Sequence, residues 1–199
     1  RSTLVKCRQR QMCIRDSTHS YGLSRKRITI STSGIVPNIL KLSQDIDVSL
    51  AISLHASDDI LRDEIVPINK KYPIKALLDA CKEYLSSFKN KKTITMEYIL
   101  IDGINDSIEH AKQLAILLSD ISCKINLIPF NKFKGTTYKR PSNNKMSIFK
   151  KYLMDKGFIT TLRITRGDSV AAACGQLVGD LSNTVKGKNL IKHRSINER

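Results

Sequence analysis

The chain has 199 residues, of which 41% are hydrophobic and 26% are charged, and its formal net charge is +16. This composition predicts a soluble globular protein of about one domain that can bury a hydrophobic core. Because the sequence has no apolar run of about 18 residues and no apolar segment behind its basic start, we expect no transmembrane helix, no secretory signal and a cytoplasmic location.

The positive charge is concentrated at the two ends of the chain. Residues 1–27 hold eight Lys or Arg against one Asp, and residues 182–199 hold five against one Glu. Basic flanks on a compact body suit a polyanion such as nucleic acid. Solvated tails that only increase solubility are the alternative.

Residues 1–20 show neither helical nor strand periodicity, whereas strands and helices alternate from residue 27 onward. The apolar and β-branched runs predict strands at residues 28–32, 48–54, 93–101, 124–129 and 160–165. The amphipathic runs predict helices at 37–42, 74–88, 107–119 and 145–155, with a helical turn at 61–66 and a basic loop at 67–71. This alternation predicts an α/β protein with a parallel sheet, either an open doubly wound sheet or a barrel.

The predicted loop at residues 130–141 alternates aromatic with basic side chains and is long for an α/β connection. Phosphate contacts and base stacking both suit such a loop. Its candidate RNA-binding residues are Lys132, Lys134, Lys139 and Arg140.

Polar side chains follow the predicted strands where each strand ends. In a parallel α/β fold these carboxyl ends form one rim, where ligands usually bind. A single serine at a strand end is often a turn former, and a single histidine is often exposed or has its hydrogen bonds satisfied within the protein. The prediction of a ligand site therefore depends on the convergence of several such residues. The converging residues are Ser31, Ser33, Ser53, His55, Asp102 and Asn131.

The five cysteines form no CxxC pair, so we expect neither a disulfide framework nor a metal site built from them. Cys81 and Cys123 lie in apolar contexts typical of a core. Cys174 differs, because its neighbours are Ala and Gly, and Arg163 and Arg166 upstream favour a thiolate. A small buried hydrophobe is the alternative interpretation of Cys174.

Five blocks of sequence, in this order, resemble the radical SAM adenine-C2 methyltransferases of 23S rRNA and tRNA, the RlmN family. The resemblance covers about residues 22 to 180. The blocks are GLSRKRITISTSGIVP, LAISLHA, RDEIVPINKKY, CKINLIPFN and RGD followed by AACGQL.

The resemblance implies a partial (β/α)6 radical SAM barrel that uses S-adenosylmethionine (SAM) and a [4Fe-4S] cluster. In this family one SAM methylates a cysteine sulfur, and a radical made from a second SAM activates that methyl group for transfer to adenine C2. By this resemblance Cys174 is the cysteine that carries the methyl group as S-methylcysteine. The SAM-binding residues are then Ser31, Ser53, Leu54, His55 and Asn131.

The family's CxxxCxxC cluster motif, its Gly-Glu SAM contact, its resolving cysteine and its acidic proton acceptor precede Gly22, and this sequence has none of them there. We therefore expect no metal ligand in this chain, a barrel truncated at its N-terminal strands, and an enzyme fragment that is inactive alone. Residues 1–17 are interpreted as non-native sequence.

The resulting division of the chain is an irregular segment at 1–20, a partial barrel with SAM and RNA sites at 21–181 and a basic tail at 182–199. The expected partners are 23S rRNA and tRNA and an electron donor for the cluster, with no membrane and a monomeric protein. Two other functions fit the residues: a non-catalytic basic RNA-binding α/β domain, and an unrelated α/β enzyme with Cys174 as a thiol nucleophile.

Overall fold

The structure, a computed structural model, describes residues 28–45, 47–88, 92–132 and 136–163. The segments predicted at 1–20 and 182–199, and Cys174, lie outside these residues.

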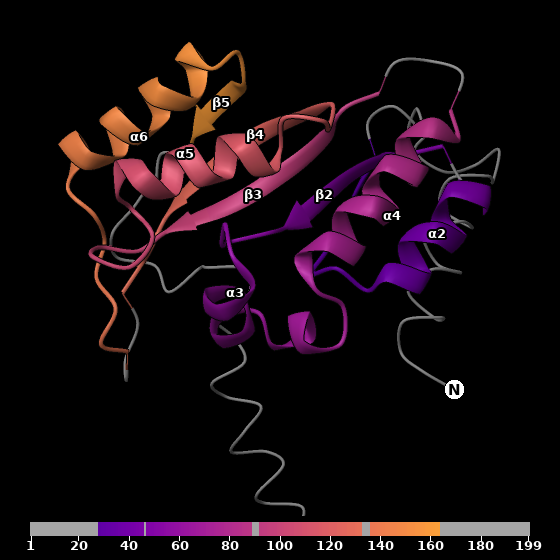
Figure 1. The fold of residues 1–199 in the computed structure, drawn as a ribbon, viewed down its shortest axis with the longest axis horizontal. Helices are drawn as coiled ribbons and strands as arrows, with labels where there is room; N and C mark the ends of the chain where they lie inside the picture. The colour runs from indigo at the N-terminus through magenta and orange to yellow at the C-terminus, as the bar shows by residue number, and fades with distance from the viewer. Residues whose placement is uncertain (1–27, 46, 89–91, 133–135, 164–199) are drawn as a thin grey trace, which may run out of the picture.

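The described part of the chain contains one parallel sheet whose strands follow their order in the sequence (Figure 1). Each strand pairs in parallel with the next along the chain. The strands are β1 (Thr29–Thr32), β2 (Ser49–Ser53), β3 (Ile94–Leu100), β4 (Cys123–Pro129) and β5 (Ile159–Leu162).

The strand order distinguishes between the two predicted architectures. A doubly wound sheet reverses its strand order at a switch point, and the order β1-β2-β3-β4-β5 contains no reversal. Because crossovers between parallel strands are right-handed, this order puts every connecting helix on the same face of the sheet. Figure 1 shows α2, α4, α5 and α6 together on one side of the sheet. The α/β class is confirmed, and the topology is that of an arc of a (β/α) barrel rather than of a doubly wound sheet.

The helices agree with the sequence pattern except at some of their ends and at one connection. Residues 67–71 were expected to form a basic loop, but Pro67–Lys70 is a 3₁₀ helix with Pro67 at its start and Asn69 buried. The helix expected from residue 145 begins at Asn143, because the hydroxyl of Ser142 accepts a hydrogen bond from the Lys145 N–H and caps the helix. The helical elements are α2 (Val36–Asp45), α3 (Asp59–Ile65), η2 (Pro67–Lys70), α4 (Ile74–Ser86), α5 (Ile108–Leu117) and α6 (Asn143–Asp155).

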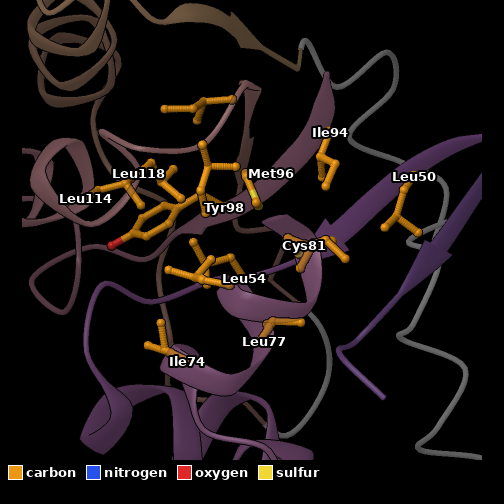
Figure 2. Packing of buried hydrophobic residues seen from close by; sticks show 14 of the residues in the cluster. Leu50, Leu54, Ile74, Leu77, Cys81, Ile94, Met96, Tyr98, Leu114 and Leu118 are labelled. Atoms are coloured by element: carbon orange, nitrogen blue, oxygen red, sulfur yellow. The ribbon is translucent and has the colours of Figure 1, made fainter. Parts of the chain in front are cut away.

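The core lies between the sheet and this helical layer. Figure 2 shows Leu50 and Met96 of the sheet near Leu77 and Cys81 of α4, and Tyr98 near α5. Each fully buried Leu, Met or Ile contributes about 1.5–3 kcal/mol through removal of apolar surface from water. The core therefore anchors the helix-facing side of every strand.

The opposite face of the sheet is different in character. Along β3 the helix-facing residues are buried, whereas Thr95, Glu97 and Ile99 between them are only partly buried. Side chains at paired positions of neighbouring parallel strands share a face, and the register pairs Glu97 with Ser53 and with Asn126. We call this side of the sheet, which no described helix covers, the inner face.

Candidate functional site

The inner face carries a row of polar side chains across four strands. Ser53, Glu97, Asn126 and Thr161 occupy paired positions on β2, β3, β4 and β5. The Thr161 hydroxyl donates to Asn126 Oδ1 at 3.1 Å. A polar row in the middle of a sheet is unfavourable for a packed apolar core and suits a ligand with several hydrogen-bonding groups.

The two serines predicted to bind SAM lie on this face. Ser31 of β1 pairs with Ala51 of β2, and Ser53 lies two residues beyond Ala51, so all three point to the inner face. Ser31 is exposed and Ser53 is partly buried. Neither hydroxyl forms a hydrogen bond with another described residue in the structure, which leaves both free to bind a ligand.

His55 follows β2 with a positive φ of 64°, a backbone conformation that residues other than Gly rarely adopt. Its ring Nδ1 accepts the Ile99 N–H at 3.2 Å, so the neutral ring carries its proton on Nε2. Burial, and secondarily the charge of Arg62, lowers the pKa of His55 from 6.5 to about 4. At neutral pH the site therefore contains an uncharged imidazole whose Nε2 is a hydrogen-bond donor.

Leu54 lies between Ser53 and His55 and belongs to the core. Its side chain is fully buried (Figure 2), its N–H donates to the Glu97 carbonyl at 3.0 Å, and its carbonyl accepts from Arg62 Nε at 2.9 Å. Both backbone groups are therefore used in fixing the segment on which Ser53 and His55 stand.

Two buried polar side chains join the carboxyl ends of neighbouring strands, and sequence patterns did not reveal either. Asn105 accepts the Ile101 N–H at 2.7 Å and donates to the carbonyls of Ile99 at 2.7 Å and His55 at 3.1 Å, which ties β2 to β3. Arg62, on α3, donates three hydrogen bonds to carbonyls at the ends of β1 and β2 and a fourth to Asn69 of η2. Both side chains are completely buried.

The carboxyl end of β3 also contacts the loop at residues 130–141. The Asp102 N–H donates to the Lys139 carbonyl at 2.9 Å, and Lys145 of α6 contacts the carboxylates of Asp102 at 2.9 Å and Asp106 at 3.1 Å. The hydrogen bond from Lys145 lowers the pKa of Asp102. Asp102, which the sequence grouped with the ligand-binding rim, is thus engaged in an ion pair that positions α6 and the loop.

The candidate RNA-binding residues that the structure describes are Lys132, Lys139 and Arg140, and all three are exposed. Lys134 lies outside the described residues. The loop stands beside the rim, because Tyr138 packs edge-on against Phe130, whose N–H donates to the Leu100 carbonyl at 3.0 Å. Asn131, the next residue, is partly buried and follows the end of β4. The basic side chains and the SAM candidates therefore share one edge of the sheet.

A cavity of about 740 Å³ lies at the other end of the sheet, where the chain enters β3, β4 and β5. Its lining includes Thr93, Ile116, Cys123, Tyr152 and Phe158, and none of the predicted site residues. Ligands of parallel α/β folds bind at the carboxyl ends of the strands, so we place the candidate site on the rim and not in this cavity.

The two described cysteines are structural, as predicted. Cys81 is fully buried in the core, and Cys123 is partly buried and packs against it. Burial raises the pKa of both thiols to about 12, so neither is a thiolate at neutral pH. Within the described ranges, no three His, Cys, Asp or Glu side chains come close enough to hold a metal ion. None of the helices in the same ranges is both long enough and apolar enough to cross a membrane.

Comparison with curated proteins and solved structures identifies the family. No protein-family model matches the chain. The chain is 54% identical over 179 residues to the "Dual-specificity RNA methyltransferase RlmN" of Marinomonas sp. (strain MWYL1), covering 89% of this chain and 48% of that protein. It is 51% identical over 172 residues to the protein of the same name from Psychrobacter arcticus, covering 85% and 42%. The chain belongs to the RlmN family of radical SAM methyltransferases.

Solved structures agree with this family. A radical SAM methyltransferase from Sphaerobacter thermophilus superposes with a TM-score of 0.80 at 40% identity, over 86% of this chain and 50% of that one. A domain of a pyruvate-formate lyase-activating enzyme from Bacteroides vulgatus matches with a TM-score of 0.53 at 17% identity, over 68% and 80%, and supports the fold alone. The chain spans about half the length of the curated RlmN proteins that it matches.

Proposed function

We propose that this chain forms the SAM- and RNA-binding part of an enzyme that methylates C2 of adenine in 23S rRNA and tRNA. The observation that carries the proposal is the meeting of predicted SAM-binding residues from three strands at one sheet edge. Ser31 and Ser53 lie on the inner face, and His55 and Asn131 follow the ends of β2 and β4. The RlmN family of the chain supports the choice of ligand.

The site residues divide the binding of SAM between them. The free hydroxyls of Ser31 and Ser53 and the Nε2–H of neutral His55 offer hydrogen bonds to the polar groups of the ligand. A neutral imidazole does not repel the positive sulfonium of SAM, which a protonated one would do. Asn131 adds an amide at the end of β4, and Leu54 fixes the backbone between Ser53 and His55.

SAM supplies the methyl group and, after reductive cleavage, the radical that the family uses. Cys174, which lies outside the described residues, is proposed as the methyl carrier by resemblance to the family. The described residues bring together no set of side chains that would hold a [4Fe-4S] cluster. No reaction step that needs the cluster is therefore assigned to them, and we propose that this chain alone is inactive.

The loop at residues 130–141 is proposed to bind the RNA beside the SAM site. Lys132, Lys139 and Arg140 are exposed and lie at the rim end of the molecule, where they can contact phosphates. Two assignments remain predictions: a barrel with SAM and RNA sites at residues 21–181, and a basic tail at residues 182–199. A cytoplasmic, monomeric protein and an electron donor for the cluster also remain predictions.

Binding of SAM to the chain tests the proposal directly. Titration calorimetry with SAM should give one site per chain, and the double variant Ser31→Ala with Ser53→Ala should weaken it about tenfold or more, because two hydrogen bonds are worth about 1 kcal/mol each. The control is Ser86→Ala with Ser87→Ala, which removes two exposed hydroxyls at the end of α4. Equal affinity in the wild type and the Ser31 and Ser53 variant would contradict the assigned site.

A further inference from the structure

We propose that Arg62 is the positioning residue of the SAM site, and that it holds the ends of β1 and β2 in the geometry that SAM binding requires. The inference rests on the proposed function and adds a role for the RDEIVPINKKY block, in which none of the predicted site residues lies.

The guanidinium of Arg62 uses two of its nitrogens to donate to three backbone carbonyls at the ends of β1 and β2. Nε donates to the Leu54 carbonyl at 2.9 Å, and Nη2 donates to the carbonyls of Ser53 at 3.1 Å and Ser33 at 2.8 Å. These carbonyls belong to the segments that carry the proposed ligand contacts Ser53 and His55, and to the turn after Ser31. One rigid planar group thereby sets the spacing between the two segments.

The remaining donor group of Arg62 is fixed from the other side. Nη1 donates to Asn69 Oδ1 at 2.7 Å, and Asn69 Nδ2 donates to the carboxylates of Asp59 at 2.9 Å and Asp63 at 2.7 Å. Asp59 also accepts the Ile74 N–H at the start of α4, at 2.8 Å. Hydrogen bonds through Asn69 and Asp59 thus connect the guanidinium to η2, α3 and α4 on the side away from the strands.

The position of this network argues for a role in the site. A buried Arg brings a large desolvation penalty, and a well-packed apolar side chain is often as stable or more so. Here Arg62 is fully buried at the rim, and it touches both segments that bear the site serines. Gly34 leaves room for it: a Cβ at Gly34 would lie 3.2 Å from Arg62 Nη2. The network lies where the ends of β1 and β2 adjoin, so that the hydrogen-bonding fork of Arg62 fixes these two strand ends against each other.

Another buried hydrogen bond offers a matched control. The Tyr84 hydroxyl donates to the Val48 carbonyl at 2.7 Å, at the amino end of β2, where no predicted site residue lies. Tyr84→Phe therefore weakens the anchoring of the same strand without changing its carboxyl end. Arg62→Lys keeps the charge but cannot donate to three carbonyls and Asn69 with fixed geometry.

The test measures SAM affinity by calorimetry, thermal stability, and amide hydrogen exchange of residues 33–34 and 53–56 in the 199-residue chain. We expect Arg62→Lys to weaken SAM binding tenfold or more, and Tyr84→Phe to change it by less than twofold. We expect exchange of residues 33–34 and 53–56 to rise at least tenfold in Arg62→Lys and to stay unchanged in Tyr84→Phe. If Arg62→Lys does not fold, Asn69→Ala replaces it, because it removes the Nη1 partner and keeps the Arg.

SAM affinity within twofold of wild type in Arg62→Lys would overturn the inference. An equal loss of affinity in both variants would also overturn it, because the loss would then follow general stability. Absence of SAM binding in the wild-type chain would contradict the proposed function instead. In that case the exchange data still decide whether Arg62 holds the two strand ends, since they need no ligand.

Discussion

Acidification of the protein should destabilise it through His55. The unfolded chain binds a proton at His55 with a pKa near 6.5, whereas in the fold this pKa is about 4. Between these two values the unfolded state holds more protons than the folded state, so the free energy of unfolding falls as the pH falls from 6.5 to 4. Above pH 6.5 the imidazole is neutral in both states, so protonation of His55 no longer lowers the free energy of unfolding.

The size of the effect follows from the two pKa values. The difference corresponds to about 3 kcal/mol over the whole window, and to about 2 kcal/mol between pH 7.5 and pH 5. Both figures are upper values, because the side chain keeps some exposure and solvent screens its charge.

The variant His55→Asn removes the titration with little change in shape. Asn tolerates the positive φ of 64° at this position, and its Oδ1 can accept the Ile99 N–H in place of Nδ1. Urea unfolding at pH 7.5 and pH 5 should show a loss of stability in the wild type that exceeds the loss in His55→Asn by about 2 kcal/mol. The control is His110→Gln, which removes a partly buried imidazole that forms a hydrogen bond of 2.6 Å with the Ser107 hydroxyl. Parallel loss of stability in the wild type and His55→Asn would refute a buried, neutral His55.

Three further predictions concern Asn105, Gly34 and the lysines of the loop at residues 130–141. Asn105→Ala leaves three backbone groups at the ends of β2 and β3 without their partner, so it should lower the free energy of unfolding by about 2–4 kcal/mol in urea titration. A loss below about 1 kcal/mol would mean that water replaces these hydrogen bonds. Gly34→Ala should cost about 1–3 kcal/mol, because φ is 110° and its Cβ would lie 3.1 Å from Leu77; Gly103→Ala, with φ 70° and no atom within 4 Å, should cost less, and the reverse order would contradict the packing. Changing Lys132, Lys134 and Lys139 to Ala should weaken binding of single-stranded RNA and lower the salt slope by about 2; the control is Lys75, Lys82 and Lys151 on the helices, and an unchanged slope would argue against phosphate contacts.

Local patterns predicted the elements because each depends on nearby residues. The alternation ITMEYIL predicted β3, and the apolar stripe with Leu77 and Cys81 predicted α4. The strand order was not predictable in this way, since a barrel and a doubly wound sheet satisfy the same local patterns. Only the pairing of strands distinguishes them.

The site was predictable where its residues stand at strand ends, and not where its support depends on distant groups. Ser31, Ser53 and His55 are visible as polar residues after apolar runs. Arg62 looks like an ordinary helix surface residue, because the carbonyls of Ser33 and Ser53 that accept its hydrogen bonds converge only after β1 and β2 pair. Glu97 and Asn126 look like the solvent-facing positions of alternating strands until the register aligns them on the inner face.

We propose that this chain belongs to an enzyme that transfers a methyl group from Cys174 to adenine C2. The most direct test is mass spectrometry of digested rRNA and tRNA from cells that express a full-length version of the enzyme, which includes the cluster motif, either with Cys174 or with Cys174→Ala. We predict 2-methyladenine with Cys174 and none with Cys174→Ala, although the variant protein still binds SAM and RNA. Normal amounts of 2-methyladenine with Cys174→Ala would contradict the role of this cysteine.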